Sequence, residues 1–158
     1  MTERTRDEKI TRFQHGEQWL RDSVAGLSDA DLDARPIAGE WSIREVVHHM
    51  ADGEIIAAGR LRRMLAEDVP AMPGYDAARF ATDMSYQSLP LDAALNAFGA
   101  VRSLSVNLIG TLQPEQWSRT GMHSEYGEQS VERWVEGNGN HVESHVNQIK
   151  EIRAALGK

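Results

Sequence analysis

The sequence contains no cysteine among its 158 residues. Disulfide bonds, thiolate metal sites and a cysteine nucleophile are therefore all excluded. Long apolar runs are absent too, since no segment approaches the roughly 20 residues of a membrane-spanning helix. Residues 1–9 are charged and lack the apolar core of a signal peptide. We therefore expect a cytoplasmic protein with no membrane partner.

Basic residues are also in short supply. The chain has 17 Lys and Arg against 24 Asp and Glu, which gives a formal net charge of −7. Nucleic-acid binding normally needs a basic face, and the short run Arg60, Arg62 and Arg63 stands beside Glu67 and Asp68 and is typical of a solvated helix face. A DNA or RNA partner is thus not expected. With 41% hydrophobic residues, the chain has the composition of one globular domain over residues 1–158.

What the sequence does contain is helical periodicity. No strand-like alternation lasts for more than a few residues, whereas apolar residues recur at helical spacing in four long segments. Ser42 followed by Glu45 is the capping-box pattern at the start of the second segment. The pattern predicts an all-α four-helix bundle with long connections. The expected helices are residues 7–24, 43–67, 91–112 and 130–156, with short turns possible at 29–32 and 77–83.

Two long connections separate the later helices. Residues 113–130 contain two glycines that argue against a long element. A gap as long as 68–90 is often functional in a compact domain, and this one carries Tyr75, Phe80 and Tyr86. It either lies over a pocket or crosses the bundle anchored by its apolar residues. Its helix-breaking residues are Pro70, Pro73, Gly74 and Pro90.

Three histidines are the candidate metal ligands. His141 and His145 are four residues apart, so a helix places them on one face, and helical projection turns both toward the bundle interior. His49 is the best third ligand, whereas the neighbouring His48 points away. An H-x-x-x-H pair also arises by chance on amphipathic helices. Three imidazoles favour Zn²⁺ or Ni²⁺ without excluding Fe²⁺ or Mn²⁺, and they leave coordination positions open, as catalytic sites do.

Three charged residues also project inward: Glu54 on the second helix, Arg102 on the third and Glu17 on the first. Charges are rarely buried unless they are paired or bound to something. Either they line a cavity near the histidines, or small helix rotations carry them to a bundle end. In the first interpretation Glu54 and Arg102 are candidates for orienting a substrate. The sequence assigns no role to His48, His123 or Glu17.

Residues 41–54, WSIREVVHHMADGE, resemble the W-[ST]-hydrophobic-x-E signature of the DinB-like four-helix bundles. Residues 141–149, HVESHVNQI, are similar to that family's H-x-x-x-H-x-x-Q-I ending. The segments PGYDAARF, LPLDAAL and HSEYGEQS resemble the branch that contains bacillithiol S-transferases and metal-dependent hydrolases. Two segments depart from that branch. Residues 136–140 stand where relatives carry an aromatic, His-rich stretch, and Gly53-Glu54 replaces a Ser-His pair.

This resemblance implies a divalent metal, usually zinc or nickel, on His49, His141 and His145, and often a homodimer. It also implies a metal that binds and activates a low-molecular-weight thiol. We expect a metal-dependent transferase or hydrolase acting on a small molecule. A metal-containing protein that sequesters a toxic compound without turnover is the alternative, and a purely structural helical domain is the third possibility.

Overall fold

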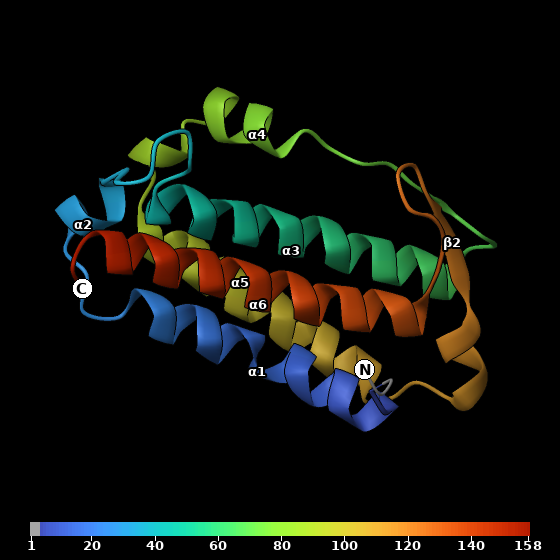
Figure 1. Cartoon of the computed structure of the whole chain (residues 1–158). Helices are drawn as coiled ribbons and strands as arrows, with labels where there is room; N and C mark the ends of the chain where they lie inside the picture. The colour runs from blue at the N-terminus through green and yellow to red at the C-terminus, as the bar shows by residue number, and fades with distance from the viewer. Residues whose placement is uncertain (1–3) are drawn as a thin grey trace.

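The computed structural model describes residues 4–158, and within them four long helices form a bundle (Figure 1). These are α1 (Arg6–Val24), α3 (Ile43–Ala66), α5 (Leu91–Ile109) and α6 (Val131–Ala155). Helix α3 packs against α5 and α6, and α1 packs against the same two helices from the other side. The predicted four-helix bundle is confirmed. No helix in this described part combines the length and apolar character that a membrane span requires.

Local sequence explains where the helices begin and end. The side chain of Ser42 accepts a hydrogen bond from the backbone of Glu45, whose carboxylate accepts one from the Ser42 backbone, so the predicted capping box is confirmed. Helix α5 ends three residues before the predicted position 112. After Ile109 the backbone hydrogen bonds join residues three apart instead of four: Thr111 N donates to Leu108 O, and Leu112 N donates to Ile109 O. This is the pattern of a 3₁₀ turn, which is common at the C-terminus of an α-helix.

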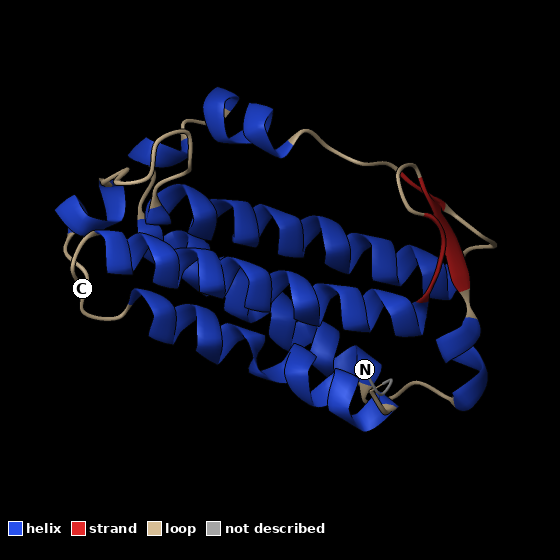
Figure 2. Cartoon of the chain, in the orientation of Figure 1, coloured by secondary structure: helices blue, strands red, loops and turns tan. Residues whose placement is uncertain are grey.

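A small three-stranded sheet at one end of the bundle was not predicted (Figure 2). Strand β1 (Ala71–Met72) pairs in parallel with β2 (Thr120–His123), which pairs antiparallel with β3 (Gly127–Ser130). Strands of two to four residues are too short to show alternation in a sequence. Four short helices complete the fold: α2 (Asp29–Asp33), α4 (Ala77–Asp83), η1 (Tyr86–Ser88) and η2 (Pro114–Ser118).

A glycine lets this sheet lie close to the bundle. A Cβ atom at Gly121 would fall 2.9 Å from Sδ of Met72 and 3.1 Å from Cγ of Met64. Met64 belongs to α3 and Met72 to β1, and both are buried. Glycine at position 121 therefore lets β2 lie against α3 without displacing either methionine side chain.

The core consists of two apolar clusters with a polar layer between them. Along α3, one cluster ends at Ala51 and the other begins at Ala57, with buried Glu54 between them. Glu54 accepts hydrogen bonds from Arg102 on α5, from Nε at 2.8 Å and from Nη2 at 2.6 Å. Arg102 also donates from Nη1 to the carbonyl oxygen of Phe13 at 2.8 Å and lies over the Phe13 ring. A charge-assisted pair thus crosses the middle of the bundle.

The inward orientation predicted for Glu54 and Arg102 is confirmed, but the cavity proposed to explain it is wrong for these two residues. Their side chains are each about 2% exposed and are satisfied by each other. Glu17 is half-buried against Gly99 of α5 and pairs with Arg21, its Oε1 lying 3.0 Å from Nε. The inward charges are therefore accounted for by ion pairs within the protein.

Candidate metal centre

The structure brings His49, His141 and His145 together between α3 and α6. Nε2 of His141 lies 3.3 Å from Nε2 of His49 and 3.1 Å from Nε2 of His145. One ring nitrogen from each histidine can be chosen so that all three lie within 4.8 Å of one another. His48 is turned away and stacks on Tyr86, with ring centroids 5.5 Å apart. Of this adjacent pair, His49 is therefore the one that joins the other two histidines, as its predicted orientation implied.

The space around the three rings depends on Gly53, one turn after His49 on α3. A Cβ atom at Gly53 would lie 3.2 Å from Oη of Tyr75 and 3.7 Å from Cε1 of His141. The Tyr75 hydroxyl and the His141 ring thus share the opening that this glycine leaves. Trp41 packs beside His49 with ring centroids 5.1 Å apart and covers another side of the cluster.

A second layer of polar groups orients His145. Its Nδ1 lies 2.8 Å from Oε1 of Gln148, and Nε2 of Gln148 donates to Oε2 of Glu40 at 3.3 Å. An amide oxygen only accepts hydrogen bonds, so Nδ1 of His145 carries the proton and Nε2 keeps its lone pair. Metal-bound histidines typically show this arrangement, in which the second ring nitrogen is held by an outer partner. The donor set therefore fits a metal ion.

Burial keeps the three rings neutral. Burial, reinforced by the neighbouring imidazoles, lowers the pKa of His49 to about 4 and that of His141 to about 3. The pKa of His145 is also lowered by burial, although its bond to Gln148 opposes the shift. Metal ions bind neutral imidazole, so all three rings are in the binding form at pH 7.

The same pKa values predict how the stability of the metal-free protein depends on pH. An unfolded histidine has a pKa near 6.5, so below that value the unfolded chain binds more protons than the folded chain does. The contribution of His49 and His141 to stability is therefore full above about pH 6.5 and is lost as the pH falls through 4. We expect chelator-treated protein to lose on the order of 2 kcal/mol from each of these two rings between pH 7 and pH 4.5.

Urea unfolding at the two pH values measures this loss. Carboxylates titrate in the same range, so the informative quantity is the difference between wild type and His141→Asn, which cannot accept a proton there. The variant should lose less stability than the wild type over the interval. An equal loss in both proteins would contradict the assignment of the effect to the histidines.

A cavity of about 470 Å³ opens from the histidines and runs between α3 and α6 toward the sheet. Helix α3 contributes a stripe at helical spacing, formed by His49, Gly53, Ala57 and Arg60. Helix α6 contributes Arg133, Trp134, Gly137, Asn138 and His141. Gly137 faces open space, whereas Gly139 packs against the backbone of Phe13 in α1, so only the second glycine mediates a close helix approach.

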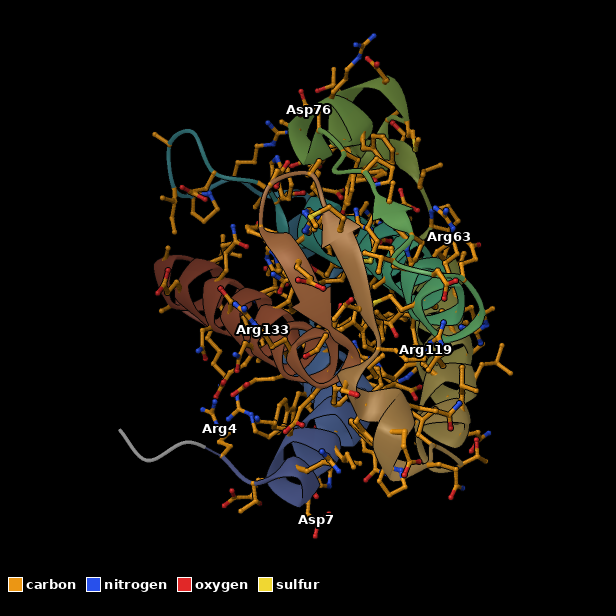
Figure 3. The ribbon with its side chains drawn as sticks, turned by 90° about the vertical axis from the view of Figure 1, so that its right-hand side faces the viewer. Arg4, Asp7, Arg63, Asp76, Arg119 and Arg133 are labelled. Carbon is orange, nitrogen blue, oxygen red and sulfur yellow. The ribbon has the colours of Figure 1, made fainter. Side chains whose placement is uncertain are left out.

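The roof of this cavity comes from the two long connections. Figure 3 views this end of the bundle, where the β2–β3 hairpin lies between α6, which carries Arg133, and α3, which carries Arg63. Tyr75 lines the cavity, so the first part of the 68–90 connection does cover a pocket, as one of the two interpretations had it. Tyr86 does not line the cavity: its side chain is buried, and its hydroxyl donates a hydrogen bond to Asp52.

The sequence analysis gave no role to His123 and placed Arg60 elsewhere, but both residues line the cavity. His123 is buried in β2 at the far end of the cavity, and its Nδ1 accepts a hydrogen bond from the backbone N–H of Glu125 at 3.1 Å. Arg60 was placed on a solvated helix face with Arg62 and Arg63, and this was wrong, because it is half-buried and lines the cavity. The stripe of residues at intervals of three and four that starts at His49 could have identified Arg60.

The sequence of this chain matches a known protein family and several named proteins. Residues 12–149 match the DinB superfamily. A protein of Oceanobacillus iheyensis named "Putative metal-dependent hydrolase" is 30% identical over 125 residues, covering 79% of this chain and 72% of that protein. A Bacillus mycoides protein of the same name is 25% identical and covers 96% and 88%.

Two solved structures share the fold. YfiT from Bacillus subtilis, described as a probable metal-dependent hydrolase with an unusual four-helix bundle topology, superposes with a TM-score of 0.91. Its sequence is 23% identical, and the match covers 99% of this chain and 90% of YfiT. The mycothiol-dependent maleylpyruvate isomerase has a TM-score of 0.76 at 16% identity, covering 94% of this chain and 63% of the isomerase.

Proposed function

This chain belongs to the DinB superfamily, and from that premise and its three-histidine cluster we propose that it is a metal-dependent enzyme acting on a small molecule. The observation that carries the proposal is the convergence of three neutral imidazoles, two of which line a cavity of about 470 Å³. A cavity of this size suits a small-molecule ligand. The relatives named as metal-dependent hydrolases agree with this class of activity.

His49, His141 and His145 would hold the ion. A set of three neutral imidazoles without thiolate ligands favours Zn²⁺ or Ni²⁺. When bound, such an ion acts as a Lewis acid and makes a thiol or a water molecule nucleophilic near neutral pH. Because the protein supplies three ligands, further coordination positions stay open toward the cavity, as in catalytic rather than structural sites.

Tyr75 is the side chain best placed to assist beside the histidines. Its hydroxyl lies at the opening above Gly53 next to His141, and burial raises its pKa, so it stays protonated and can donate a hydrogen bond to a substrate. Glu54 and Arg102 lie outside the cavity lining and bond to each other. The role of orienting substrate stays a prediction for this pair, and any such role would be exerted through other residues.

Within this class we favour thiol S-transfer over hydrolysis. The family resemblance of residues 41–54 and 141–149 supports a thiol substrate, and so does the likeness of the fold to a mycothiol-dependent isomerase. A homodimer and a cytoplasmic location, which the sequence led us to expect, are further parts of the proposal.

The proposal predicts turnover that depends on the metal. Protein loaded with Zn²⁺ or Ni²⁺ is expected to accelerate conjugation of a low-molecular-weight thiol to an electrophile such as monobromobimane, whereas chelator-stripped protein is not. The assay follows thiol consumption across a panel of thiols and electrophiles, with ester and amide hydrolysis measured in parallel. His145→Ala serves as the control that lacks one ligand.

The pattern of results separates the candidate functions. Hydrolysis without thiol transfer would select the hydrolase. Metal-loaded protein that binds thiols or electrophiles but turns over none of the panel would contradict an enzyme and favour sequestration without chemistry.

A further inference from the structure

We propose that the end of the cavity remote from the histidines is a carboxylate-binding site formed by Arg60, with Arg133 at its rim. A substrate of this protein would then be a small acid whose reactive group reaches the histidines while its carboxylate meets the guanidinium of Arg60. The carboxylate site stands on the geometry of these residues, and only its link to a reaction rests on the proposed function.

Arg60 is a half-buried cation without an acidic partner. In the described part of the chain it forms no ion pair, and its one hydrogen bond runs from Nη2 to the carbonyl oxygen of Pro73. Arg63, three residues on, instead pairs with Glu67 at 2.8 Å. Arginine stays charged at neutral pH even though burial lowers its pKa here. A partly buried guanidinium that forms no ion pair within the protein can donate hydrogen bonds to the carboxylate of a ligand.

The other charges around this end favour a singly charged ligand. Arg133 lines the same cavity, is exposed, and has no ion-pair partner among residues 4–158. Glu125 on the hairpin is the one carboxylate in the lining; it is exposed and forms no ion pair with Arg60, although its charge is near enough to raise the pKa of that guanidinium, which burial lowers. Burial lowers the pKa of His123, so that ring is neutral. Two cations against one anion suit a carboxylate better than a doubly charged phosphate.

The distance to the histidines sets the length of the ligand. Arg60 follows His49 by eleven positions on α3, which corresponds to about 16 Å along the helix axis. Both side chains lean toward the N-terminus of the helix, and the longer arginine reaches further in that direction than the imidazole, so a ligand joining them spans less than about 16 Å. The lining also contains Ala57, which lies between His49 and Arg60 on α3, and Met72 and Trp134, which add apolar surface. The expected ligand therefore has an apolar middle, a carboxylate at one end and a reactive group at the other.

The test compares two thiol probes of about this length. Mercaptooctanoate carries a terminal carboxylate, and mercaptooctanol is its neutral counterpart. Their affinities are measured by protein NMR titration on chelator-stripped and on Zn²⁺-loaded protein. Wild type is expected to bind the acid about tenfold more tightly than the alcohol in both forms. Arg60→Gln should lose that preference while binding the alcohol as before.

Two further variants sharpen the comparison. Arg62→Gln removes the same charge from the same helix at an exposed position outside the cavity lining and should leave the preference intact. Glu125→Gln removes the competing carboxylate and should raise the affinity for the acid. The same spectra report whether each variant is folded.

Three results would overturn the carboxylate site: equal affinities of wild type for the two probes, failure of both to bind, or an equal loss for both in Arg60→Gln. Failure of the proposed function has a different signature. In that case zinc loading would improve the binding of neither thiol, while the Arg60-dependent preference for the acid would persist in the stripped protein.

Discussion

Replacing His141 by alanine is expected to lower metal affinity by at least about a hundredfold, so that the purified variant carries almost no metal. His141 is the central member of the three-histidine cluster, because its Nε2 lies within 3.3 Å of the corresponding atoms of both other histidines. Without it, two imidazoles remain, on different helices. Metal content per chain after equilibrium dialysis against Zn²⁺ or Ni²⁺ measures the effect, with elemental analysis as the readout.

His48→Ala is the matched control. His48 is a buried histidine on α3, directly before His49 in the sequence, but its ring faces Tyr86 rather than the cluster. This variant should keep the metal content of the wild type. The site would be refuted if wild type and His141→Ala bound equally little metal, or if His48→Ala lost metal as completely as His141→Ala did.

Replacing Glu54 by leucine is expected to produce the largest loss of stability from a single substitution, about 3–5 kcal/mol. The change leaves the guanidinium of Arg102 charged and about 2% exposed, without the carboxylate that bonds its Nε and Nη2 atoms. The Phe13 carbonyl oxygen and the ring beneath Arg102 satisfy only part of that group. Urea unfolding of wild type and variant measures the loss in the free energy of unfolding.

The double variant Glu54→Leu with Arg102→Met tests the physical reason. Removing both charges removes the buried unpaired group, so stability should recover to within about 1–2 kcal/mol of wild type. A double variant as unstable as Glu54→Leu alone would show that packing, and not the unpaired charge, causes the loss. A stable double variant that keeps metal and turnover would show that the pair is structural and does not orient substrate.

The parts of this fold that sequence could predict are those governed by local rules. The capping box at Ser42 and the four-residue spacing of His141 and His145 depend on single helices, and the structure confirms both. The pairing of Glu54 with Arg102 depends on which helices are neighbours. Helical projection therefore found that both face inward but not that they face each other.

The same distinction explains what was missed around the cavity. The sheet joins residues 71–72 to residues 120–123, about 50 positions away, through backbone hydrogen bonds that leave almost no side-chain pattern. Arg60 looked solvated because its charge was weighed against its neighbours in sequence. Its surroundings are set instead by Pro73 and by the hairpin, which approach from other parts of the chain.

The roof of the cavity and the wall that carries the histidines belong to different kinds of structure. The wall is made of helix residues whose neighbours also form the core, so changes there disturb folding. The tip of the roof, residues 124–126, is an exposed turn between β2 and β3 in which Glu125 and Tyr126 reach the cavity. Such turns tolerate substitution and insertion. Substitutions at these few exposed residues would therefore change which molecules fit the cavity, without altering the three histidines or the bundle that holds them.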